Sequence, residues 1–178
     1  VNWNNYINQR LAMKVPATVT ITNISYNSTT NQIDATVSST FVGDVKGDYR
    51  INLYIKENNV YGPLNDSTDN QWNQHNALYN IPASPYYQYG NLIGSEYVMS
   101  ASSYKHQYVI NDFADGAYGA TGIIPNNSST IGQTYSKNYS YTLPTATSGE
   151  FRYNADNIYL IATVSEHNAS TNEKIILN

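Results

Sequence analysis

The chain has 178 residues, of which only 12% are charged, and its formal net charge is −4. This charged share is about half of that in a typical globular protein, and Asn, Ser, Thr and 18 tyrosines take the place of the missing charges. The aromatic content excludes a disordered chain, and the scattered lysines and arginines argue against binding to nucleic acid.

No cysteine is present, which excludes disulfides, thiolate metal sites and cysteine nucleophiles. No apolar run approaches the roughly 20 residues of a membrane-spanning helix. The chain begins with Val1 and shows no signal peptide, so we expect a processed mature chain or an excised domain. Its length predicts one domain over residues 1–178, and its composition favours an extracellular or cell-surface setting.

The first segment, residues 2–14, is expected to form a short helix that ends before Pro16, because a residue that precedes proline avoids the helical region. Apolar residues recur in it at helical spacing, at Trp3, Tyr6, Ile7 and Leu11. We interpret residues 1–16 as a packing helix or a linker.

Strands follow in steady succession, recognised by alternating side chains and β-branched residues. The expected ranges are 17–26, 32–41, 49–57, 104–110, 133–143, 157–166 and 173–177. The first three are joined by short turns and predict a meander, whereas 157–166 is apolar on both sides and is expected inside a sheet, covered on both faces. The predicted fold is therefore an all-β antiparallel β-sandwich of about seven strands, with a short N-terminal helix and a long insertion.

The insertion covers residues 58–103. Loops of this length are usually functional or disordered, and the many aromatic residues favour an ordered one. Its candidate binding platform consists of Trp72, Tyr79, Tyr86, Tyr87 and Tyr89. These rings either form an exposed surface for sugars or protein partners, or pack the insertion onto the sheet.

The stretch after the insertion predicts a central strand with one aromatic face, which continues through Tyr108 and Ile110 and onto which the insertion folds back. Two glycine turns follow it. The residues of this structural motif are Tyr104, His106, Gly116, Tyr118 and Gly119. We expect His106 to be a partly buried imidazole that hydrogen-bonds the backbone of the insertion.

Six short segments carry a family resemblance: residues 54–58, 104–110, 116–119, 132–135, 139–144 and 157–164. In this order they resemble the C-terminal β-sandwich of the 28-kilodalton outer membrane protein family of Bacteroidota. The family's central motif reads aromatic-x-His-x-His-Val-hydrophobic-Arg, and here Tyr108 stands at the second His and Asn111 at the Arg. The resemblance implies an outer-membrane or secreted setting and carries over no enzymatic activity.

Catalytic motifs are absent from the sequence: it contains no nucleophile elbow, P-loop or dinucleotide fingerprint. The glutamates of the strand region, mostly at strand ends, are Glu57, Glu96, Glu150 and Glu166. Nothing pairs them as glycoside hydrolysis requires, and the three histidines lie too far apart in sequence to suggest a zinc site. We expect a protein that is not an enzyme.

Calcium is the one cofactor that the sequence suggests, and the signal is weak. The candidate ligands are Asp66, Asp69, Asp112 and Asp115. Neither loop has the spacing of an EF-hand, and turns closed by Asx side chains explain the same residues.

Seven Asn-x-Ser/Thr sequons are candidate glycosylation sites. They begin at Asn23, Asn27, Asn65, Asn126, Asn127, Asn138 and Asn168. In a chain so rich in Asn, Ser and Thr, chance alone explains several of them.

These observations favour a non-enzymatic extracellular or cell-surface module for structure or adhesion, with protein partners. Two alternatives stay open. The first alternative is a self-assembling filament subunit that pairs edge strands. The second is a carbohydrate-binding module that uses the aromatic insertion.

Overall fold

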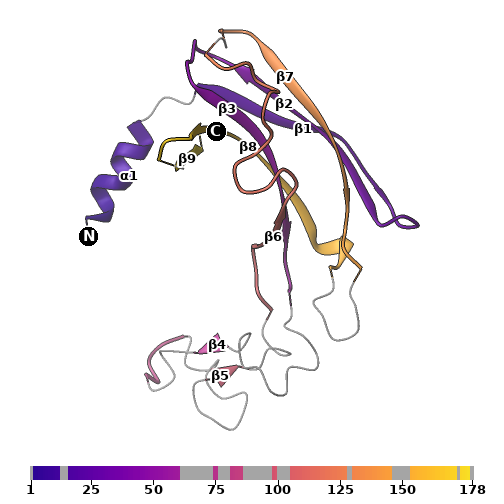
Figure 1. The fold of residues 1–178 in the computed structure, drawn as a ribbon. Helices are drawn as coiled ribbons and strands as arrows, with labels where there is room; N and C mark the ends of the chain where they lie inside the picture. Colours follow the sequence, from indigo (N-terminus) through magenta and orange to yellow (C-terminus); the bar gives the residue numbers. More distant parts are fainter. Residues whose placement is uncertain are drawn as a thin grey trace. The chain divides into compact units, whose positions relative to one another are not determined.

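A computed structural model describes residues 2–12, 16–60, 74–75, 81–85, 98–99, 105–127, 130–145, 153–171 and 173–176. The elements are α1 (Trp3–Ala12), β1 (Ala17–Asn27), β2 (Gln32–Phe41), β3 (Asp48–Glu57), β4 (Gln74–His75), β5 (Val98–Met99), β6 (Val109–Phe113), β7 (Thr134–Thr142), a 3-10 helix (Ala155–Asn157), β8 (Ile158–Asn168) and β9 (Glu173–Ile176). The strands form one sheet in the order β1-β2-β7, a second in the order β6-β3-β8-β9, and a small pair β4-β5 (Figure 1). The predicted all-β antiparallel fold is confirmed.

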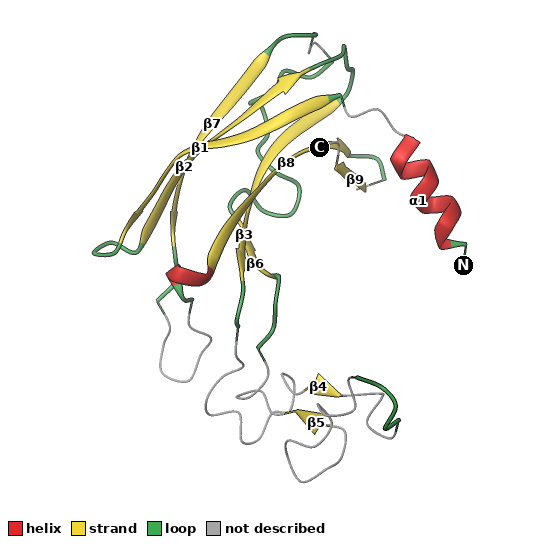
Figure 2. Cartoon of the chain, turned by 180° about the vertical axis from the view of Figure 1, so that it is seen from behind, coloured by secondary structure: helices red, strands yellow, loops and turns green. Residues whose placement is uncertain are grey.

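The chain divides into two compact units. Unit 1 comprises residues 1–54, 112–142 and 160–178, and unit 2 comprises residues 55–111 and 143–159. Strands β3, β6 and β8 contribute residues to both units. Figure 2 shows the 3-10 helix of unit 2 directly before β8.

The core of unit 1 lies between the two sheets. The alternation along β1, β2 and β3 points every second side chain inward, as the sequence predicts. The buried cluster consists of Ala17, Val37, Phe41, Tyr49, Ile51, Leu53, Ile124, Tyr139 and Val164. Edge-to-face contacts of Phe41 with Tyr49 and Tyr135 fill its end, with ring centroids 5.8 and 6.0 Å apart.

The predicted meander of the first three strands is wrong. β2 pairs antiparallel with β1 and with β7, while β3 belongs to the other sheet. The reason is that alternation identifies which side chains are buried but carries no information on which strand lies alongside. The β1–β2 register is regular from Ala17 to Thr22 and shifts at a bulge between Thr22 and Ser25, where Asn23 has a φ of 52°.

The outer face of the β1-β2-β7 sheet carries rows of hydroxyl groups. Thr40 Oγ1 lies 2.7 Å from Thr134 Oγ1, and Ser38 Oγ lies 2.8 Å from Ser136 Oγ, so neighbouring strands are joined by side-chain hydrogen bonds. Each pair is joined by a hydrogen bond that needs no charged partner.

Two predictions for the second sheet need correction. The strand expected at 104–110 begins only at Val109, because Tyr108 adopts a φ of 60° that no regular strand contains. It is also an edge strand and not a central one. β8 does lie inside its sheet, but it is covered on both faces only over Thr163–Ser165, while Tyr159 and Ile161 are exposed.

The predicted N-terminal helix is present as α1, Trp3–Ala12, and residues 13–15 lie outside the described part of the chain. The apolar side chains of its predicted stripe, Trp3, Tyr6, Ile7 and Leu11, are all exposed. This exposure favours the linker interpretation. Within the described residues, no helix is both long and apolar enough to cross a membrane.

Of the predicted insertion, the structure describes the opening residues 58–60, a turn at 81–85, and the antiparallel pair β4–β5, in which Gln74 lies opposite Met99. The proposed binding platform of Trp72, Tyr79, Tyr86, Tyr87 and Tyr89 lies outside the described residues, as does Tyr104.

Candidate functional site

A row of three side chains crosses unit 2. Lys56 projects from β3, Tyr159 from the neighbouring β8, and Tyr108 directly precedes β6 on the other side. The ammonium group of Lys56 lies 4.2 Å from the centroid of the Tyr108 ring and 4.6 Å from that of Tyr159. The two tyrosines are 74% and 52% exposed. We call this arrangement the Tyr–Lys–Tyr row.

The backbone at the row is strained. Tyr108 has a φ of 60° and Asn59 a φ of 56°. The left-handed region costs an L-residue about 1–2 kcal/mol, and such conformations gather at functional sites. Asn58 stabilises the left-handed conformation of Tyr108, because its Oδ1 accepts a hydrogen bond from the Tyr108 N–H at 3.0 Å.

Amide side chains flank the row. Gln107 Nε2 donates to Asn59 Oδ1 at 2.9 Å, and Asn59 Nδ2 donates to Asn157 Oδ1 at 3.4 Å. The Asn58 N–H donates to the Asn157 carbonyl at 3.1 Å, which ties β3 to the segment that leads into β8. Amides both donate and accept, so this border can hydrogen-bond hydroxyl groups of a ligand.

A buried carboxylate joins the segments that carry the row. Glu57 is 2% exposed, and it accepts a hydrogen bond from Asn111 Nδ2 at 2.6 Å and one from the Asn154 N–H at 2.8 Å. Burial raises the pKa of the Glu57 carboxyl, although both hydrogen bonds lower it. These bonds link β3 to β6 and to the loop before Tyr159.

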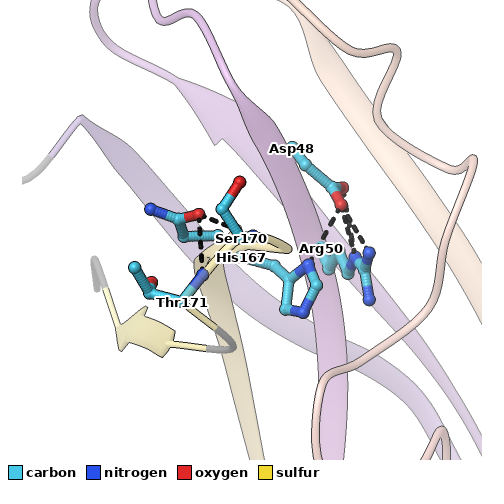
Figure 3. A network of polar contacts seen from close by, with 6 residues as sticks. Asp48, Arg50, His167, Ser170 and Thr171 are labelled. Atoms are coloured by element: carbon cyan, nitrogen blue, oxygen red, sulfur yellow. Dashed lines mark hydrogen bonds and ion pairs between the residues drawn. The ribbon is translucent and has the colours of Figure 1, made fainter.

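A second polar network lies in unit 1, where the Asp48 carboxylate contacts both Arg50 and His167 (Figure 3). Arg50 Nε donates to both Asp48 oxygens at 3.0 and 3.1 Å, and His167 Nδ1 lies 3.3 Å from Asp48 Oδ2. Its hydrogen bond with Arg50 holds the pKa of Asp48 below the ordinary value. The Tyr118 ring packs edge-on against His167, with centroids 5.0 Å apart.

Beside this network, Ser170 lies in the turn between β8 and β9. Its backbone N–H donates a hydrogen bond to Asn168 Oδ1 at 3.0 Å. We therefore interpret the Asp48 network as a structural support for β3 and β8.

Asp112 and Asp115, the predicted calcium ligands, bond to side chains of β7. Asp115 accepts a hydrogen bond from Tyr139 Oη at 2.6 Å and pairs with the ammonium group of Lys137. Asp112 accepts one from Tyr141 Oη at 2.6 Å. An ammonium group at Asp115 disfavours a cation there. No group of three or more metal-binding side chains occurs in the described part of the chain, and Asp66 and Asp69 lie outside it.

The remaining predicted site residues lie apart from the row. His106 is half-buried, and its backbone pairs with Val60, at 2.8 and 3.0 Å. Gly116 and Gly119 belong to a segment that crosses β3 in unit 1, where the Asn52 amide donates to the Gly116 carbonyl at 2.8 Å. Six of the sequon asparagines, Asn23, Asn27, Asn126, Asn127, Asn138 and Asn168, are exposed, and Asn65 lies outside the described residues.

The alternation in the sequence predicts part of the Tyr–Lys–Tyr row. Alternation places Lys56 on the outward side of β3 and Tyr159 opposite the inward residues of β8, as the structure has them. It does not show that these strands are neighbours, nor that the backbone turns Tyr108 into the left-handed region. Glu57 lies on the same inward side of β3 as Ile55 and Leu53, and this alternation indicates that its side chain is buried.

Comparison with known proteins yields no match to any family model, to any curated protein or to any solved structure. The resemblance to the 28-kilodalton outer membrane protein family therefore stays a prediction.

Proposed function

We propose that this chain is a non-enzymatic adhesion module of an outer cell surface and that it binds carbohydrate through the Tyr–Lys–Tyr row. The observation that carries the proposal is the exposure of two tyrosine rings beside an ammonium group, one of them held by a strained backbone. Two exposed aromatic rings on either side of one ammonium group form a surface suited to recognition.

Sugar rings match this surface chemically. The apolar face of a pyranose packs against an aromatic ring, while its hydroxyl groups need hydrogen-bond partners. The ammonium of Lys56 donates only, and the amides of Asn59, Gln107 and Asn157 donate and accept. A row with one apolar part and one polar border supports binding of a neutral or weakly acidic glycan.

The engagement of the acidic side chains supports a function without catalysis. Glu57 accepts hydrogen bonds from amide groups, Asp48 is held by arginine and histidine, and Asp112 and Asp115 are held by tyrosine and lysine. Glycoside hydrolysis needs two carboxyl groups that face each other, about 5–10 Å apart across a cleft. The charge-poor composition and the family resemblance support the surface location.

The test is glycan retention by the whole chain, measured on an array and by affinity electrophoresis in gels that contain soluble polysaccharides. Tyr108→Gly removes one ring and at the same time relieves the positive φ, so this variant stays folded and loses retention. Tyr26→Gly, at another exposed tyrosine on β1, is the matched control and keeps retention. Equal retention by Tyr108→Gly, or hydrolysis of the bound glycan, would contradict the proposal.

A further inference from the structure

A bulge in β1 interrupts the outer face of the β1-β2-β7 sheet. The β1–β2 register shifts between Thr22 and Ser25, so two residues of β1, Asn23 and Ile24, oppose one residue of β2. Asn23 has a φ of 52°, a left-handed conformation that asparagine adopts more readily than most residues. Bulges re-aim side chains and are over-represented beside functional sites.

The bulge borders a pocket of about 370 Å³ on this face. Its volume lies within the range of small-molecule sites, roughly 300–1,000 Å³. The lining residues come from all three strands and are Asn23, Asp34, Ala35, Thr36, Asn138, Tyr139 and Ser140. Ala35 and Tyr139 are buried residues of the inner side, so the other five supply the polar groups. Ligand pockets are usually lined mainly by apolar side chains, and this polar lining therefore favours a polar ligand.

Hydrogen bonds orient the polar side chains of the pocket. Asn23 Nδ2 donates to Thr36 Oγ1 at 3.2 Å, and Thr36 Oγ1 donates to Asn138 Oδ1 at 2.9 Å. Asp34 Oδ1 accepts a hydrogen bond from Gln32 Nε2 at 2.9 Å. Within the described part of the chain, the groups left to bond a ligand are Asn23 Oδ1, Asp34 Oδ2, Asn138 Nδ2 and the Ser140 hydroxyl.

The charge of the outer face limits the class of ligand. Asp34 is the one charged residue in the cross-strand rows of this face, which run from Thr18–Thr40–Thr134 to Asn27–Gln32–Thr142. Without a basic side chain, the face does not suit a phosphate, sulfate or carboxylate group. A metal ion or an ammonium group uses acceptors only and would leave the Asn138 amide without a partner. Hydroxyl groups both donate and accept, and they match the whole set.

From these observations we infer that the pocket at the β1 bulge binds one neutral sugar residue through its hydroxyl groups. The Asp34 carboxylate accepts the strongest of these bonds, because a charged acceptor strengthens a hydrogen bond. The Asn23 carbonyl and the Asn138 amide bond to neighbouring hydroxyls of the same ring. The pocket lies in unit 1 and the Tyr–Lys–Tyr row in unit 2, so the inference does not depend on the function proposed for the row.

The first experiment is a titration of the isotope-labelled whole chain, followed by nuclear magnetic resonance. The probes are the methyl glycosides of mannose, galactose, glucose and N-acetylglucosamine. At least one of them should shift the side-chain amide signals of Asn23 and Asn138 and the backbone signals of Asp34 and Ser140. If none of the glycosides shifts these signals, or if only calcium chloride does, the inference is overturned.

The second experiment repeats the titration with variants that keep the fold. Asp34→Asn retains the oxygen that Gln32 bonds and removes the charge, so it should weaken binding about tenfold. Asn23→Gly removes the amide but keeps the positive φ, and it should weaken binding about fivefold. Asn127→Gly is the matched control, because Asn127 has a φ of 58° and lies outside the pocket. Unchanged affinity in Asp34→Asn overturns the inference.

A third titration separates this pocket from the Tyr–Lys–Tyr row. Tyr108→Gly alters the row alone and should leave the shifts at Asp34 and Asn138 unchanged. Loss of these shifts in Tyr108→Gly would mean that the sugar binds at the row, and it would overturn the inference of a separate pocket.

Discussion

On the outer face of the β1-β2-β7 sheet, exposed hydroxyl groups hydrogen-bond one another in pairs such as Thr40 and Thr134. On the outer side of β3, by contrast, Asn52 and Tyr54 are buried beneath other segments. The segment after β6 lies over Asn52, whose amide donates to the Gly116 carbonyl. Tyr54 Oη accepts hydrogen bonds from Thr163 at 3.1 Å and Lys174 at 2.6 Å.

The difference shows how a chain with few charges distributes them. The hydroxyl rows are self-sufficient, so a single substitution leaves little unsatisfied. Around β3, charged and polar groups join separate segments, and the removal of one group leaves its partner buried without a bond. We therefore expect the outer side of β3 to be far less tolerant of mutation.

The largest effect is expected at Gly119. Its φ is +84°, and an added Cβ would lie 2.8 Å from the Ile51 carbonyl oxygen and 3.2 Å from the Arg50 Cβ. Gly119→Ala should lower the free energy of unfolding by about 3 kcal/mol, from backbone strain and from displacement of the covering segment. Urea denaturation followed by tyrosine fluorescence measures the change.

Gly122→Ala is the matched control, because Gly122 has a φ of +76° but no atom within 4 Å of an added Cβ. This variant should lose only the backbone part, about 1 kcal/mol. Equal losses in the two variants would show that the close approach to β3 contributes nothing.

A smaller effect is expected from Glu57, and it depends on pH. Its pKa is raised in the folded state above the ordinary value of 4.5, so the folded chain binds this proton more tightly than the unfolded chain. The resulting stability is fully present below the unfolded pKa and is lost as pH rises through the folded pKa. Glu57→Gln should flatten this part of the profile of unfolding free energy against pH, with stability at neutral pH within about 1 kcal/mol of the parent chain.

Denaturation midpoints measured from mildly acidic to neutral pH provide the test. Glu166→Gln, the same substitution on β8, controls for the loss of one negative charge. An unchanged slope in Glu57→Gln would mean that another group binds the proton.

The smallest effect is expected in the hydroxyl rows. Thr40→Val keeps the β-branched shape and removes one exposed hydroxyl, so the free energy of unfolding should change by less than about 0.5 kcal/mol. The same substitution at Thr163, whose buried hydroxyl donates to Tyr54, should cost about 1 kcal/mol more. If the two variants lose equal stability in thermal unfolding, the proposed contrast between the two outer faces is wrong.

Local pattern was enough to predict most strands. The predicted ranges 17–26, 32–41 and 133–143 match β1, β2 and β7 to within one residue at each end, because the hydroxyl-out, apolar-in alternation follows directly from burial on one face. Pairing was not predictable in the same way. β2 bonds to β7 across residues that lie far apart in the sequence, and short turns suggested β3 instead.

For the candidate site, the sequence pattern predicted on which side of a strand a residue lies, but not which strands are neighbours. The outward direction of Lys56 follows from the alternation of its strand, whereas Tyr159 was expected to be covered and is exposed. The contact between the two depends on the β6-β3-β8 order. Tyr108 was placed in a regular strand because aromatic alternation contains no sign of a positive φ. Glu57 was read as a strand-end residue, although buried hydrogen bonds stabilise it inside unit 2.

The paired residues of β2 and β7 lie 94 to 110 positions apart in the sequence, while those of β1 and β2 lie only 5 to 24 positions apart. The first sheet is thus completed only after a long stretch of chain has been closed into a loop. The entropy of closing such a loop depends on the logarithm of its length, so a doubling costs only about 0.6 kcal/mol. A change in the length of the chain between β2 and β7 therefore alters the closure entropy of the first sheet only slightly.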